Sequence, residues 1–207
     1  MDLWPWTIKA RQSLLSTLEQ LDDDQWSTQS LSEGWSIREL LAHLTLAARP
    51  PPRRFLTAVA RTRGNFDKAN HLLAVADGCR PVAVLLKDYR SVVEHRFSPP
   101  GWPQAAPLGD ILLHSLDVRI PLGLPTEHPA EQYEPVMGLL FSRVGRSFTR
   151  TGRPAVRWVA SDREWTDGQG PEVSGCIADI ALTAAGRDSR VDQLSGDGMA
   201  VVRSWLN

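Results

Sequence analysis

The sequence contains little cysteine and no excess of basic residues. The chain has 2 cysteines, Cys79 and Cys176, among 207 residues. A small secreted domain held together by disulfides needs several paired cysteines, so we expect reduced thiols and a cytoplasmic location. The 23 lysines and arginines are balanced by 24 acidic residues. This balance argues against a nucleic-acid-binding protein, because neutralising phosphates requires a surplus of cations.

Long apolar runs and several familiar catalytic motifs are also missing. No stretch approaches the roughly 18 consecutive apolar residues of a membrane span, and the first residues lack the pattern of a signal peptide. The sequence contains no GxGxxG or phosphate-binding loop and no GxSxG elbow. We therefore expect no membrane association, and neither dinucleotide nor serine-hydrolase chemistry.

Apolar residues at helical spacing dominate the first two thirds of the chain. Recurrence at intervals of three and four residues predicts amphipathic helices over residues 7–21, 36–49, 81–93 and 108–120. Ser36 and Glu39 fit a capping box at the start of the second helix. A shorter helix is predicted around residues 55–59, with a break at Gly64. Four such helices predict an antiparallel four-helix bundle, in which a cofactor site would lie between facing helices.

The last third combines helical and strand patterns. Alternation predicts a strand over residues 155–160, and residues 163–166 can pair with it across a turn. Helices are predicted over residues 135–149 and 177–185, followed by a terminal helix ending near Leu206. A segment rich in proline and glycine, residues 123–129, separates the helical part from the part with mixed helix and strand patterns. We therefore predict a mainly α protein with a helical bundle over residues 1–128 and a small α+β domain over residues 129–207.

The predicted helix over residues 108–120 has two polar stripes. At about 100° per residue, Asp110, His114 and Asp117 share one arc, and Ser115 and Arg119 lie nearly opposite. A helix at the surface of a bundle needs only one wet face. Either the acidic stripe is that wet face, or Ser115 and Arg119 form it and the acidic stripe points inward. An inward stripe needs a cation or metal, because burying an unpaired acid is costly.

His43 is the second candidate for chemistry, since it lies at the edge of the apolar stripe of residues 36–49. A single histidine in that position is commonly a hydrogen-bonded core residue. Together with Asp110 and His114, however, it can complete a site with three protein ligands, as in catalytic zinc centres. His71, in a segment without clear periodicity, is an alternative ligand or a substrate contact.

Two segments resemble the DinB-like metalloenzyme superfamily. Residues 34–44, GWSIRELLAHL, are similar to its Gly-Trp-Ser/Thr capping box followed by a histidine. Residues 110–119, DILLHSLDVR, with LGLP at 122–125, resemble the mycothiol-dependent maleylpyruvate isomerase branch. The likeness continues in WTDGQGPEV at 165–173, AGR at 185–187 and LSGDG at 194–198, so it spans nearly the whole chain in order.

The resemblance implies a divalent metal held by His43, Asp110 and His114, with zinc as the usual ion and nickel as an alternative. It also implies mycothiol or a similar thiol as cosubstrate, which attacks a small electrophile in an isomerisation or an S-transfer. Asp110 departs from the family, where glutamate is expected, and its shorter side chain puts the ligation in question. Asp117 would orient a ligand histidine, or else form a salt bridge to an arginine.

Two further residues are candidate substrate contacts. Arg187 could grip a substrate carboxylate, although a cation at the end of a helix is an equally good explanation. Asn70 is the second candidate.

The resemblance leaves two classes of function open. The first is a metal- and thiol-dependent isomerase or transferase, or a hydrolase that uses metal-bound water. The second is a non-catalytic small-molecule or metal-binding protein of the same fold, which the aspartate at position 110 keeps in consideration. A monomer or a homodimer is expected in either case.

Overall fold

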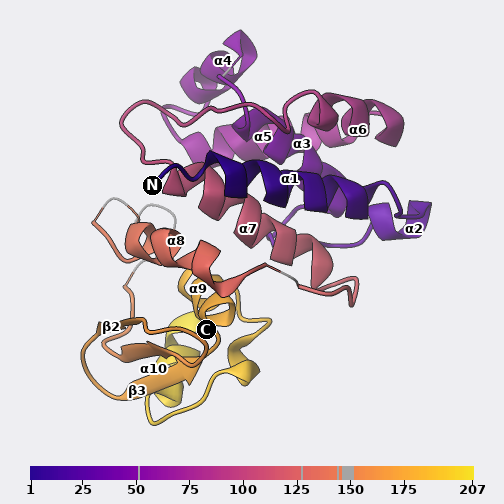
Figure 1. Cartoon of the computed structure of the whole chain (residues 1–207). Helices are drawn as coiled ribbons and strands as arrows, with labels where there is room; N and C mark the ends of the chain where they lie inside the picture. Colours follow the sequence, from indigo (N-terminus) through magenta and orange to yellow (C-terminus); the bar gives the residue numbers. More distant parts are fainter. Residues whose placement is uncertain (51, 127, 144, 146–151) are drawn as a thin grey trace. The chain divides into compact units, whose positions relative to one another are not determined.

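The computed structural model describes residues 1–50, 52–126, 128–143, 145 and 152–207. Contacts within the chain divide it into two compact units, Met1–Thr126 and Glu127–Asn207, and each is described separately (Figure 1). The boundary predicted from the sequence lies between residues 128 and 129, and the independence of the two parts as domains stays a prediction. Within the described residues, no helix combines the length and the apolar character needed to cross a membrane.

The first unit consists of helices and connecting loops. Its helices are α1 (Trp4–Leu18), α2 (Asp23–Trp26), α3 (Ile37–Ala47), α4 (Arg53–Arg61), α5 (Phe66–Gly78), α6 (Val82–Arg90) and α7 (Ala105–Arg119). The four long helices of the predicted bundle correspond to α1, α3, α6 and α7, and these four are confirmed. The predicted capping box is also present, with the carboxylate of Glu39 accepting from the backbone N–H of Ser36 at 2.7 Å.

Helix α3 lies at the centre of the packing in this unit. It packs against α5, α6 and α7, while α1 packs against α6 and α7. Its buried face is the predicted apolar stripe, Ile37, Leu40, Leu41 and Leu44, each of which is almost fully removed from solvent. Burial of such side chains contributes about 1.5–3 kcal/mol each, so this stripe fixes the position and rotation of the helix that carries His43.

Helix α5 was not predicted, although the short helix before it and the break at Gly64 are confirmed. Its large apolar residues, among them Phe66, Leu72 and Val75, are exposed. Its buried face consists of small side chains such as Ala69 and Ala74. A stripe of large apolar residues facing the core is therefore missing, and it is that stripe which usually reveals a helix in a sequence.

Gly78 allows the end of α5 to lie directly against the start of α3. A Cβ atom at this position would lie 2.9 Å from Cγ and 3.1 Å from Cα of Glu39. We expect Gly78→Ala to lower the free energy of unfolding by about 1–3 kcal/mol, because backbone as well as side chain would have to move. Urea unfolding measures this change.

Gly138 provides the matched control for this prediction. It also lies in a helix, but a Cβ there would meet nothing within 4 Å. Gly138→Ala should therefore raise stability by about 0.4–1 kcal/mol through the unfolded state. Equal effects of the two substitutions would show that the close approach at Gly78 is unimportant.

The second unit combines helices with a small sheet. Its elements are η1 (Ala130–Gln132), α8 (Tyr133–Leu140), β1 (Arg157–Ala160), β2 (Thr166–Gly168), β3 (Glu172–Gly175), α9 (Ile177–Ala184), η3 (Val191–Gln193) and α10 (Met199–Leu206). The strand order is β2-β1-β3, with β2 antiparallel and β3 parallel to β1. Helix α9 packs against β1, β3 and α8. The predicted fold class, a helical bundle followed by a small α+β part, is confirmed.

Details of this unit differ from the prediction. The strand predicted at residues 163–166 lies instead at Thr166–Gly168, because Ala160 N pairs with Trp165 O and residues 161–164 form the turn. Strand β3 was not predicted, since glycine and proline around it resemble a loop. The helix predicted over residues 135–149 is present as α8, and its expected continuation partly lies outside the described residues.

The two cysteines are free thiols in different surroundings. Cys79 is exposed, whereas Cys176 is half-buried and donates to the carboxylate of Asp179 at 3.1 Å. Burial and this carboxylate raise the pKa of Cys176 to about 11. Near pH 8 we expect Cys176 to react with a disulfide reagent roughly a hundred-fold more slowly than an ordinary exposed thiol, because the thiolate is the reactive form.

The comparison of Cys79→Ser with Cys176→Ser isolates each thiol for this measurement. The rate of the Cys176 reaction should rise about ten-fold per pH unit up to pH values near 11. Equal rates for the two single-cysteine proteins at pH 8 would contradict the prediction.

Candidate metal centre

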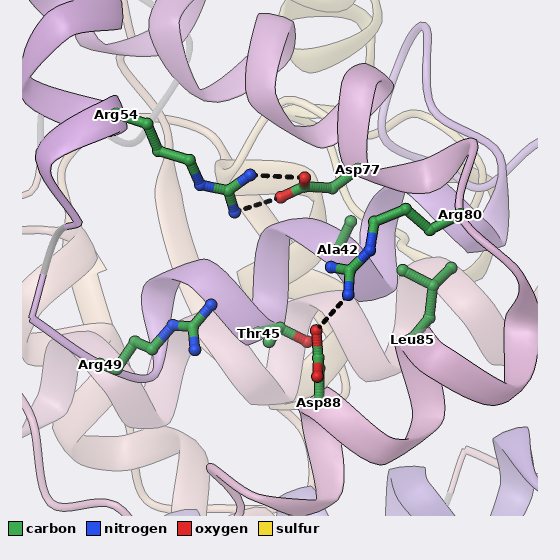
Figure 2. A pocket seen from close by; sticks show the side chains of 8 residues that line it. All are labelled: Ala42, Thr45, Arg49, Arg54, Asp77, Arg80, Leu85 and Asp88. Carbon is green, nitrogen blue, oxygen red and sulfur yellow. Dashed lines mark hydrogen bonds and ion pairs between the residues drawn. The ribbon is translucent and has the colours of Figure 1, made fainter.

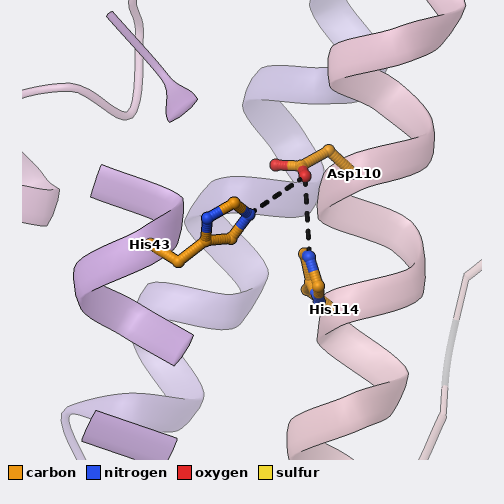
Figure 3. A group of neighbouring side chains, drawn as sticks. All are labelled: His43, Asp110 and His114. Carbon is orange, nitrogen blue, oxygen red and sulfur yellow. Dashed lines mark ion pairs between the residues drawn. The ribbon is translucent and has the colours of Figure 1, made fainter. Parts of the chain in front are cut away.

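Three side chains with metal-ligating chemistry converge between two helices of the first unit (Figure 3). His43 comes from α3, while Asp110 and His114 lie one turn apart on α7. Helices α3 and α7 pack against each other, which brings the edge of the apolar face of α3 to the polar stripe of α7. One ligand atom from each side chain lies within 4.8 Å of the other two. The structure thus brings together the three residues predicted as ligands, and their binding of a metal stays a prediction.

The distances within this cluster suit an ion better than direct hydrogen bonds. Asp110 Oδ1 lies 3.5 Å from His43 Nε2 and 3.6 Å from His114 Nε2. Both distances exceed the 2.7–3.2 Å of ordinary N–H···O bonds. Two ligand atoms that bind one zinc ion tetrahedrally, each about 2.0–2.1 Å from it, lie about 3.3–3.5 Å apart. The donor set and its spacing therefore fit a small divalent ion.

His114 is held from behind by a buried carboxylate. Its Nδ1 lies 2.7 Å from Asp117 Oδ2, and the Asp117 side chain is completely buried. An imidazole nitrogen at this distance from a carboxylate carries the hydrogen. In the neutral form of the His114 ring the lone pair is therefore on Nε2, the nitrogen on the side of Asp110. This carboxylate–histidine arrangement commonly supports metal ligands and fixes their tautomer.

Ser32 completes the support of His114, and sequence reasoning missed it. Its hydroxyl donates to Asp117 Oδ2 at 2.8 Å and lies 3.5 Å from His114 Nδ1. The backbone of the same loop also contacts α7, since Leu31 N donates to Asp117 O at 3.1 Å. Ser32 lies in a loop without helical or strand periodicity, so the spacing of residues could not predict that it contacts Asp117.

Asp110 is kept in the charged form by the polar groups around it. Burial by itself would raise its pKa, but the two histidines and the buried guanidinium of Arg11 outweigh that effect, so the pKa lies below its ordinary value. Arg11 donates to two backbone carbonyls in the segment that follows α6, including that of His95 at 2.8 Å. A carboxylate that ionises easily is a suitable metal ligand, because coordination requires the deprotonated form.

Trp35 covers one side of the histidine pair. The centroid of its ring lies 4.9 Å from that of His43 and 6.4 Å from that of His114. Gly34 has a φ of +74°, a left-handed conformation that suits glycine and lets the tryptophan turn onto the cluster. Trp35 Nε1 also donates to Nδ1 of the exposed His71 at 3.1 Å. His71 is thus a neighbour of Trp35, and a ligand role for it has no support.

The remaining candidates lie elsewhere. Asn70 is half-buried on α5 next to His71. Arg187 belongs to the second unit, where its NH1 donates to Ala185 O just beyond α9, as expected of a cation at a helix end. The roles of Asn70 and Arg187 in substrate binding stay predictions.

The assignment of Ser115 and Arg119 as the wet face of α7 is wrong. Ser115 is fully buried, and Arg119 is 9% exposed. The guanidinium of Arg119 donates to Ser13 Oγ at 3.0 Å, to Ser115 Oγ at 3.2 Å and to Pro125 O at 3.1 Å. These acceptors satisfy the charge, so α7 buries the stripe of Ser115 and Arg119. On its other polar stripe Asp117 is buried, while Asp110 and His114 stay partly exposed.

Comparison with known proteins finds a family that matches part of the chain. Residues 9–97 match the family described as mycothiol maleylpyruvate isomerase N-terminal domain, a segment that includes His43 and ends before Asp110. A comparison with curated proteins found no significant match.

Two solved structures share the fold over most of the chain. They are mycothiol-dependent maleylpyruvate isomerase and a histidine-to-alanine mutant of it, with sequence identities of 16% and 15% and a TM-score of 0.57 in both cases. Each comparison covers 94% of this chain and 92% of the other. The resemblance predicted from the sequence is therefore confirmed: residues 9–97 match this family, and the fold is shared over most of the chain.

Proposed function

We propose that the protein is a metal-dependent isomerase that uses mycothiol or a closely similar thiol to convert a cis-configured unsaturated acid of the maleylpyruvate type into its trans form. The observation that carries the proposal is the cluster of His43, Asp110 and His114, whose ligand atoms face one another at the spacing of a divalent-ion site. The family match of residues 9–97 and the shared fold support the choice of thiol and substrate.

His43, Asp110 and His114 would hold the ion, for which zinc is the first candidate because its protein ligands are typically imidazoles and carboxylates. When bound, such an ion favours the thiolate form of a thiol that reaches it. Three protein ligands leave a position for that thiol. The site thereby fits the reaction without requiring a nucleophile from the chain itself.

The residues around the ligands prepare the site for this chemistry. Asp117 and Ser32 hold the ring of His114 so that Nε2 keeps its lone pair. Trp35 lies against the ring of His43 and limits the access of water on that side. A cytoplasmic location and a monomeric or dimeric state stay predictions.

The proposed isomerisation regenerates the thiol, so the thiol is not consumed. The thiolate sulfur forms a bond to one carbon of the substrate double bond, and the electron pair of that bond moves into the conjugated carbonyl. The former double bond can then rotate as a single bond. Return of the electron pair restores the double bond in the trans form, breaks the C–S bond and releases the thiolate.

The test is to follow maleylpyruvate by its ultraviolet absorbance with zinc-loaded protein, with and without mycothiol. We expect turnover that requires the thiol and leaves its concentration unchanged. Consumption of the thiol in proportion to product would indicate an S-transferase instead. Turnover that is independent of thiol, or no turnover with metal-loaded protein, would contradict the proposal.

A further inference from the structure

A second concentration of charge lies on the other side of α3 from His43 (Figure 2). A narrow hollow between α3, α4, α5 and α6 is lined by Thr45, Arg49, Arg54, Asp77, Arg80 and Asp88, among others. Thr45 follows His43 by two residues, which is about 200° around the helix. The hollow is therefore separate from the candidate metal centre.

Two of the three arginines at this hollow are already paired. Arg54 binds Asp77 with both nitrogens of its fork, including NH1 to Oδ1 at 2.6 Å. Arg80 NH2 donates to Asp88 Oδ2 at 2.7 Å. Each carboxylate is thus paired with one arginine, and the dashed lines in Figure 2 mark both pairs, while none reaches Arg49.

Arg49 brings a third guanidinium without a matching acid. Three arginines and two aspartates leave the lining with one net positive charge. The Nε of Arg49 is buried, and nothing within the described residues accepts a hydrogen bond from it. Thr45 gives no help, because its hydroxyl donates to Leu41 O at 2.9 Å. Burying an N–H of a charged group without an acceptor costs free energy. An acceptor from outside the chain would therefore stabilise this atom.

We propose that this hollow binds an oxyanion, the carboxylate or phosphate group of a small ligand, with Arg49 as its main contact. The planar fork of an arginine matches the oxygens of both groups, and the donors of Arg54 and Arg80 line the same space. The hollow has a volume of about 10 Å³, which is room for a single oxygen atom. One oxygen of the oxyanion would therefore enter it, and the rest of the ligand would extend into solvent. Binding would connect the end of α3 with α4 and α6 and so stabilise the first unit.

The experiment measures binding of inorganic phosphate and of acetate to the metal-loaded protein by titration calorimetry, with sodium chloride at equal ionic strength as reference. The same anions should raise the midpoint of thermal unfolding in a saturable way, because a ligand that binds only the folded state stabilises it. Phosphate and acetate together cover the two possible sources of the group, and saturable binding of either one supports the proposal.

Arg49→Gln tests the assigned contact, and Arg61→Gln is the control. Arg61 is an exposed arginine in the last turn of α4, so its replacement changes the net charge by the same amount. We expect R49Q to fold normally and to bind the anion at least about ten-fold more weakly, while R61Q binds as the wild type does. Binding of neither anion above the chloride reference would overturn the proposal, as would unchanged affinity in R49Q.

Discussion

We expect alanine in place of His114 or His43 to abolish the binding of a divalent metal and the proposed thiol-dependent activity, and to leave the chain folded. Each substitution takes away one of three ligand atoms that converge between α3 and α7. The two remaining ligands, Asp110 and one histidine, cannot complete a site with three protein ligands. We therefore expect the affinity for zinc to fall by more than about 100-fold, which exceeds the cost of losing a supporting hydrogen bond.

Metal analysis after dialysis against a small excess of zinc measures this effect. The wild type should retain about one ion per chain. His95→Ala is the matched control, because that histidine is exposed and contributes only its backbone carbonyl to Arg11. Circular dichroism and thermal unfolding of the metal-free proteins show whether the variants fold. If both variants retain the metal, or if the wild type holds none, the proposed centre is wrong.

Asp117→Asn gives the second large effect, although this residue would not touch the metal. The asparagine has nearly the same shape, but it can turn its NH₂ group toward His114 Nδ1. That nitrogen would then accept a hydrogen bond, and the hydrogen of the neutral ring would move to Nε2, where the lone pair is needed. We expect the affinity for zinc and the turnover to fall by about 10–100-fold.

Competition with a coloured chelator measures the zinc affinity of this variant. Asp24→Asn is the control, since Asp24 is an exposed acid on α2 and loses the same charge. A merely structural role for Asp117 would lower the stability of the metal-free protein without a selective loss of zinc affinity. Wild-type affinity in D117N would show that the tautomer of His114 does not depend on this carboxylate.

The ligand cluster could be approached from the sequence because most of it is local. Asp110, His114 and Asp117 share one helix, and helical spacing alone places them on one side of it. The position of His43 beside an apolar stripe made it a possible third ligand, but only the resemblance to a known family favoured that role, since nothing in the sequence says which helix faces α7. The supporting serine could not be predicted, because Ser32 reaches Asp117 from 85 residues away in the chain.

The errors have physical causes as well. Periodicity treats every polar residue as a candidate for solvent, but Arg119 finds enough oxygen acceptors to be buried on the opposite side of α7. Helix α5 was missed because it packs with small residues against α3. In both cases the burial depends on contacts with other parts of the chain, and these contacts cannot be recognised in the local sequence.

The origin of Asp110, His114 and Asp117 on a single helix determines where the chain can tolerate insertions and deletions. One residue added between positions 110 and 117 would rotate part of the set by about 100° and shift it by 1.5 Å, which would dismantle the centre. Residues 48–104, in contrast, connect α3 to α7 without contributing a ligand. We therefore expect length variation among homologous chains to gather in this connection, while the spacing within α7 stays constant.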